Sequence, residues 1–150
     1  MFWSRKKPKK FRLAAEQIKP LAEGHGGCFA SDTITVDGRK VAWMYRESPD
    51  FDEDSGWRFF SLHEPQDDDP SKWEIYDVNT IANYDPEIVP LLDAPEGSAF
   101  ERAGGTGEFI EVHDFQPPEE LARAIVSFLL SPSPTHPFTC SRAHSPPFIV

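Results

Sequence analysis

Strand-forming and alternating apolar residues dominate one early stretch, CFASDTITVDGRKVAWMYRE, residues 28–47. Residues 33–36 are strand formers, and Val41, Trp43 and Tyr45 occupy every second position after them. The Asp-Gly pair at residues 37–38 favours a two-residue turn, because both positions tolerate positive φ. The pattern predicts an antiparallel hairpin in which residues 29–36 pair with residues 39–46.

Further strand patterns follow this predicted hairpin. The segment GWRFFS, residues 56–61, predicts a strand with Trp57 and Phe59 on one face and Arg58 and Phe60 on the other. GSAFER and GEFIEV, on either side of Gly-Gly, predict a second hairpin.

Helix signals are short except near the C-terminus. Pro20 limits a first helix, and Asp85, Pro86 and Glu87 provide a cap and a favourable first turn for another. Residues 117–130 show helical apolar spacing after a double proline. We therefore predict an α+β fold: a single domain with a mostly antiparallel sheet, two β-hairpins, a few short helices and a C-terminal helix.

Composition divides the chain into three segments. Residues 1–10 are basic, and we expect a flexible N-terminus rather than a nucleic-acid or lipid contact. Residues 11–130 form the predicted domain, and residues 131–150 are rich in proline, which predicts an irregular tail.

The net charge of −10 is unevenly distributed along the chain. Six of the 15 basic residues lie among the first twelve positions, so the rest carries nine basic residues against 25 acidic ones, a net charge of −16. Such a body repels nucleic acid and attracts basic partners.

No segment has the length and hydropathy of a membrane span, and two cysteines indicate reduced thiols in a cytoplasm. We expect a protein partner, with no nucleic acid and no membrane, and the oligomeric state is left open.

Asp50, Asp52 and Asp54 lie at alternate positions, like the start of a calcium loop. An EF-hand is excluded because the glycine comes one position late and Ser61 stands where the final glutamate belongs. A looser divalent-metal site is one alternative, and an acidic loop between strands, with Gly56 providing an unusual backbone step, is the favoured interpretation. We expect no metal and no cofactor.

Two other groups of residues are considered for catalysis. Cys28 beside His25 lacks an orienting third group, so a small residue at a strand start is favoured over a nucleophile. The polar cluster from Asp77 to Asp85 fits helix caps and Asx-turns better than acid–base chemistry. The alternative functions are a metal-dependent hydrolase that uses one of these Asp clusters, or a regulatory module that binds a small ligand in an aromatic pocket.

Three blocks of sequence resemble a bacterial family. They are GGCFASDTITVDGRKVAWMYRE, DSGWRFFS and IYDVNTIANYDPEIVPLLDAPEGSAFER, and the resemblance covers about residues 11–112. The family is catalogued as domain of unknown function 2185 and is similar to the immunity protein 33 group. Leu62 and His63 depart from its usual glycine and acid, and the tail after Leu130 does not resemble it.

The resemblance implies a non-enzymatic, cytoplasmic protein that binds and neutralises a toxin domain, and it carries no catalytic residues. Rigid aromatic residues beside clustered acids favour a protein interface, with a basic toxin as the expected partner. The expected contact residues are Asp50, Asp52, Glu53, Asp54, Trp57, Asp67, Asp68, Asp69 and Trp73.

Overall fold

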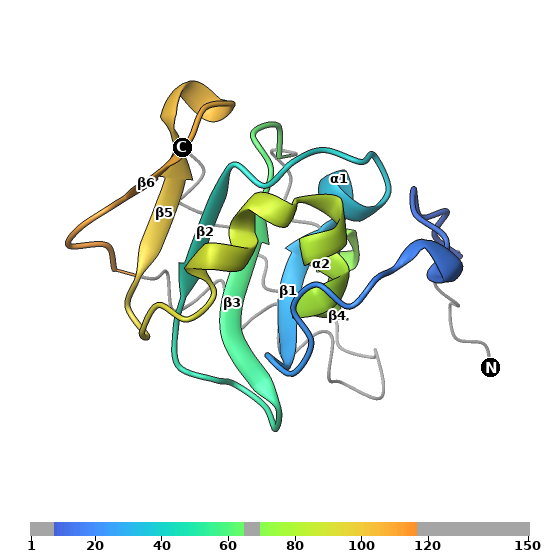
Figure 1. The fold of residues 1–150 in the computed structure, drawn as a ribbon, viewed down its shortest axis with the longest axis horizontal. Coiled ribbons are helices and arrows are strands. Elements are labelled where there is room, and N and C mark those ends of the chain that lie inside the picture. Colours follow the sequence, from blue (N-terminus) through green and yellow to red (C-terminus); the bar gives the residue numbers. More distant parts are fainter. Residues whose placement is uncertain (1–7, 65–69, 117–150) are drawn as a thin grey trace, which may run out of the picture.

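A six-stranded sheet organises the residues that the computed structural model describes, which are 8–64 and 70–116 (Figure 1). Its strands lie in the order β4-β1-β3-β2-β5-β6, and every pair is antiparallel except β1 with β3. The predicted α+β class with a mostly antiparallel sheet is therefore confirmed. In chain order the strands are β1 (Gly27–Ser31), β2 (Trp43–Arg46), β3 (Asp54–Phe60), β4 (Trp73–Asp77), β5 (Ala99–Arg102) and β6 (Phe109–Glu111).

Short helices cover one face of the sheet, in front of the strands in Figure 1. The buried Trp57 and Phe59 of β3 pack there with Ile81, Ile88 and Leu92 from the helical layer. Such apolar burial is the main driving force for folding. The predicted C-terminal helix lies outside the described residues. The helices are α1 (Asp32–Thr35), α2 (Val78–Tyr84) and the 3-10 turns η1 (Ala15–Gln17), η2 (Pro70–Lys72), η3 (Pro86–Leu91) and η4 (Ala103–Gly105).

The opposite face of the sheet is rich in aromatic side chains. Tyr45 and Phe60 stack with ring centroids 5.7 Å apart, and Trp73 meets Phe60 edge-on at 4.9 Å. Arg58 lies over the ring of Phe29 on this face, at 4.5 Å from the centroid. Residues 58 and 60 thus face away from residues 57 and 59, and the alternation predicted for β3 is confirmed.

The hairpin predicted from residues 29–36 and 39–46 is wrong. β1 ends at Ser31, whose hydroxyl accepts a hydrogen bond from Thr33 N and so caps α1. Gly38, at φ 78°, follows the C-terminal end of this helical turn, and its N–H donates to Ile34 O. A local cap therefore overrides the strand propensity of residues 33–36. Long-range pairing places β3 between β1 and β2.

Other local predictions hold. The second hairpin is formed by β5 and β6, joined through Gly104 and Gly105, which both have positive φ. Asp85 caps η3 by accepting a hydrogen bond from Glu87 N. Strand β4 was not predicted, because its residues follow a long acidic segment without a clear alternating pattern.

Candidate functional site at the acidic end of the sheet

The loop between β2 and β3 is shaped by Asp54 and Gly56. The carboxylate of Asp54 accepts hydrogen bonds from Asp50 N at 2.7 Å and from Gly56 N at 2.8 Å. Gly56 has φ +89°, and a Cβ there would lie 2.1 Å from Glu47 O. Only glycine fits this position without displacing the backbone. The unusual backbone step predicted before Trp57 is confirmed.

Arg58 lies at the centre of three carboxylates. Its guanidinium donates two hydrogen bonds to Asp54, at 2.9 and 2.8 Å, and further bonds to Glu47 at 2.6 Å and Asp50 at 3.1 Å. Arg58 and the Asp54 side chain are buried, and the Glu47 side chain is 10% exposed. We call these four residues the Arg58 cluster, whose formal charge is −2 when all four groups are ionised.

The Arg58 cluster shifts the pKa values of its acids in opposite directions. Burial alone would raise the pKa of Asp54, but hydrogen bonds and charge from Arg58 outweigh burial and lower it. For Glu47, burial is the largest effect and raises the pKa, although Arg58 opposes it. Asp54 is thus held as a carboxylate, whereas Glu47 is the weaker acid of the two.

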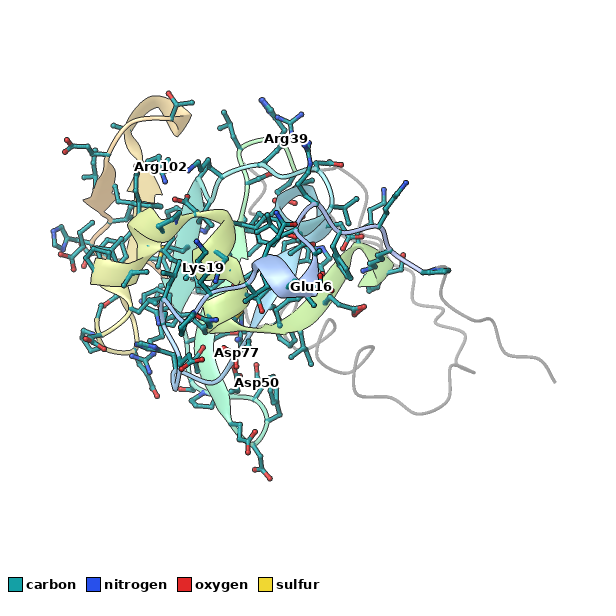
Figure 2. All side chains as sticks on the ribbon, turned by 45° about the vertical axis from the view of Figure 1, so that its right-hand side comes forward. Glu16, Lys19, Arg39, Asp50, Asp77 and Arg102 are labelled. Carbon is teal, nitrogen blue, oxygen red and sulfur yellow. The ribbon has the colours of Figure 1, made fainter. Side chains whose placement is uncertain are left out.

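Exposed acids gather at this end of the sheet, where β1 and β3 begin and β2 and β4 end. A 3.2 Å hydrogen bond from Ser48 Oγ to Glu96 joins two of the loops, and His25 Nε2 lies 3.5 Å from Asp93. In Figure 2, Asp50 and Asp77 are labelled at this end and Arg39 at the opposite one. We call the following exposed residues the acidic end: Glu23, Asp50, Asp52, Glu53, Asp77, Asp93 and Glu96.

The arginines nearest to the acidic end are bound internally. Arg46 donates from Nε to Ser55 O at 2.9 Å and from Nη1 to Ala94 O at 2.7 Å. Arg58 is occupied by its own cluster. The acidic loops therefore present negative charge outward, and a cation from outside could approach Asp52 and Glu53 without displacing an internal one.

The expected contact residues lie in different environments. Asp52 and Glu53 are exposed, and Asp50 is exposed although one of its oxygens meets Arg58. Trp57 is fully buried, and its indole N–H donates to Leu92 O at 3.2 Å. Asp54 is buried as well, so these two residues shape the loop and the core instead of facing a partner. Trp73 is half-buried against Phe60, and Asp67, Asp68 and Asp69 lie outside the described residues.

The polar cluster near α2 serves as caps and braces. Asp77 caps α2 by accepting from Asn79 N at 2.8 Å. Asn79 Oδ1 accepts from the backbone N–H groups of Leu21 and Ala22, both at 2.7 Å. Asp85 accepts at 2.6 Å from Arg102, whose guanidinium is held over the ring of Phe109. The structural interpretation of this cluster is confirmed.

Two candidates for chemistry are placed unfavourably. Cys28 is fully buried in the core, and burial raises the pKa of its thiol, so the reactive thiolate is disfavoured. The metal alternative at residues 50–54 meets a different obstacle, because the Arg58 guanidinium already occupies the space between the carboxylates. Within residues 8–64 and 70–116, no three His, Cys, Asp or Glu side chains are grouped to hold a metal ion.

Comparison with models of known protein families identifies the family of this chain. The model of the immunity protein Imm33 domain matches residues 28–113, more than half of the chain. The chain belongs to the Imm33 immunity protein family. Neither the curated proteins nor the solved structures yielded a match. In the described part of this Imm33 domain, no helix has the length and apolar character needed to cross a membrane.

Sequence analysis did not predict that the remaining acids of the acidic end lie near residues 50–53, although Asp77 was considered there for caps and catalysis. Glu23, Asp77, Asp93 and Glu96 come from three separate segments, and only the folded sheet brings these segments to the same end as residues 50–53. Gly27 is in register with both Asp54 and Asp77, and Ser48 donates to Glu96. The residues adjacent to each of these acids in the sequence do not indicate that the acids meet at one end of the sheet. Arg58 was assigned to the correct face of β3, but its three carboxylate partners were not predicted.

Proposed function

We propose that this Imm33 protein is a non-enzymatic bacterial immunity protein that acts in the cytoplasm. It binds a cognate toxin domain and blocks it through the acidic end. Family membership supports the immunity role. The observation that carries the proposed location is the gathering of exposed carboxylates on converging loops whose neighbouring arginines are already bound. The partner surface that complements it is basic.

The contact set follows from side-chain exposure. Asp50, Asp52 and Glu53 stay in the proposed interface, and Asp93 and Glu96 join them from the neighbouring loop. Asp54 instead holds the loop in shape through Arg58. Because exposed charges mainly accelerate association, the interface is expected to bind quickly at low salt and more slowly at high salt.

Calorimetry tests this proposal with the full chain and a toxin-like domain encoded beside its gene. We expect one-to-one binding with nanomolar or tighter affinity and loss of toxin activity in the complex. A neighbouring toxin domain that stays active and unbound at micromolar concentrations would contradict the proposal. Titration of the chain alone with Mg²⁺, Ca²⁺ or Mn²⁺ tests the hydrolase alternative, since a true site would stabilise the fold.

A further inference from the structure

Strand β6 forms an outer edge of the sheet, on the left in Figure 1. Its register with β5 pairs Ile110 with Glu101. Flanking hydrogen bonds run from Ala103 N to Glu108 O at 2.9 Å and from Val112 N to Ala99 O at 2.8 Å. Antiparallel ladders alternate, so Ile110 is bonded to β5, whereas the N–H and C=O groups of Phe109 and Glu111 point away from the sheet.

The outward edge of β6 keeps the geometry needed to accept another strand. Residues 107–112 contain no proline, and the register with β5 is regular. Proline and bulges are two of the devices that block strand addition at an edge, and short strands and charged side chains are others. The three-residue β6 carries charge but neither proline nor a bulge, so a strand of opposite charge can still add to it. In the described part of the chain, the backbone groups of Phe109 and Glu111 that face outward have no strand beside them.

Side chains around this edge combine one apolar anchor with negative charge. Ile110 is 52% exposed, unusually high for a large aliphatic side chain within a strand. Its cross-strand neighbour Glu101 is exposed too. Arg102, the cation on the neighbouring strand β5, is buried and bound to Asp85 and Glu87. The remaining exposed acids on or beside β6 are Glu108, Glu111 and Asp114.

The negative charge around β6 determines which kind of strand can add to this edge. Two copies of β6 side by side would concentrate the exposed Glu108 and Glu111 of both copies at one seam, and this local excess of negative charge opposes their association. A strand with basic side chains would meet those carboxylates favourably and could cover Ile110 with an apolar residue. The acids thus favour a basic strand over a second copy of β6.

We propose that β6 is a docking edge for an extended basic segment of a protein partner, which adds to the sheet as a further strand. Main-chain hydrogen bonds to Phe109 and Glu111 supply affinity, Ile110 supplies an apolar contact, and the surrounding acids select positive charge. This inference goes beyond the toxin-binding proposal, because it uses an edge of the sheet instead of the acidic end.

Two substitutions at one residue separate strand addition from charge attraction. Glu111→Pro removes the charge and the outward N–H, whereas Glu111→Gln removes only the charge. The pairing of Ile110 with Glu101 is retained in both variants, and edge positions tolerate proline. The probe is a fluorescein-labelled peptide, Lys-Val-Lys-Val-Lys-Val-Lys. Its binding to each variant is measured by fluorescence anisotropy at low and at moderate salt.

We expect the peptide to bind Glu111→Pro at least about fivefold more weakly than Glu111→Gln, since one main-chain hydrogen bond is lost. Equal binding by the two variants would overturn the proposal. Should Glu111→Pro fail to fold, amide exchange in the unsubstituted protein decides the question. Slower exchange at Phe109 and Glu111 on peptide binding supports the docking edge, whereas slower exchange confined to residues 50–53 contradicts it. The peptide experiment does not involve the toxin domain. A negative result would therefore overturn the docking edge and leave the immunity proposal intact.

Discussion

At the scale of single residues, Asp54 and Arg58 explain how an acidic loop can be both ordered and part of a core. Asp54 contributes its two oxygens to backbone N–H groups and to the guanidinium. Breaking a buried pair of this kind costs about 3–5 kcal/mol, because the remaining charge is left uncompensated. A charge reversal at Asp54 would therefore report on folding, so tests of binding belong on Asp52 and Glu53.

Gly56 tests the shape of this loop. We predict that Gly56→Ala lowers the free energy of unfolding by at least about 2 kcal/mol, because a strained φ is combined with a backbone clash against Glu47 O. The matched control is Gly97→Ala. Gly97 has φ +93° but nothing within 4 Å of the added Cβ, so we expect a loss of about 1 kcal/mol. Urea denaturation measures both, and equal losses would show that the clash is relieved cheaply.

Glu47 and Asp54 give stability an opposite dependence on pH. The folded pKa of Glu47 is raised above its ordinary value of 4.5, so the folded state binds its proton more tightly and stability falls as the pH rises through this region. The folded pKa of Asp54 is lowered below 3.8, so its contribution is present above that value and is lost as the pH falls through the folded pKa.

We predict that Glu47→Gln removes part of the decline above pH 4.5 and leaves in place the acid-side loss, to which Asp54 and Glu87 contribute because Arg58 and Arg102 lower their pKa values. Burial also raises the pKa of Asp32, but this residue titrates in both proteins. The difference between the two curves of unfolding free energy against pH therefore isolates Glu47. Parallel curves between pH 4 and 7 would contradict this assignment.

At the scale of elements, the sequence predicted secondary structure correctly where adjacent residues alone determine it. The β5–β6 hairpin, the faces of β3 and the cap by Asp85 all followed from adjacent residues. The first hairpin failed because the Ser31 cap turns the chain into α1, and because the pairing of β1 with β3 is a long-range choice. Likewise, the sequence predicted an acidic loop that contains Asp50, Asp52 and Glu53. It did not predict which acids from other loops lie near them.

Asn79 links two elements and provides a test at this scale. Its buried side chain ties α2 to residues 19–22 through bonds to Leu21 N, Ala22 N and Lys19 O. We predict that Asn79→Ala costs about 1–3 kcal/mol, because backbone groups lose their acceptor. Amide exchange at Leu21 and Ala22 should accelerate as well. In the control Asn83→Ala, water can replace the exposed bonds to Lys19, so a smaller loss is expected.

At the scale of the whole molecule, the exposed carboxylates of the acidic end lie together at one end of the sheet. The acidic end lies opposite the exposed Arg39 in Figure 2, and the Arg58 cluster beneath it carries surplus negative charge. Such a field orients a basic partner before contact and raises its association rate. The membership of the chain in the Imm33 family makes a toxin domain the proposed partner.

The most direct test compares two double charge reversals in binding to the toxin domain encoded beside the gene. Asp52→Lys with Glu53→Lys changes the acidic end, and Glu16→Lys with Asp37→Lys makes the same net change at exposed acids elsewhere. Calorimetry at low salt should show at least about tenfold weaker binding, or roughly 1.4 kcal/mol, for the first pair and near-unchanged binding for the second. Equal affinities for the two double variants would contradict binding through the acidic end.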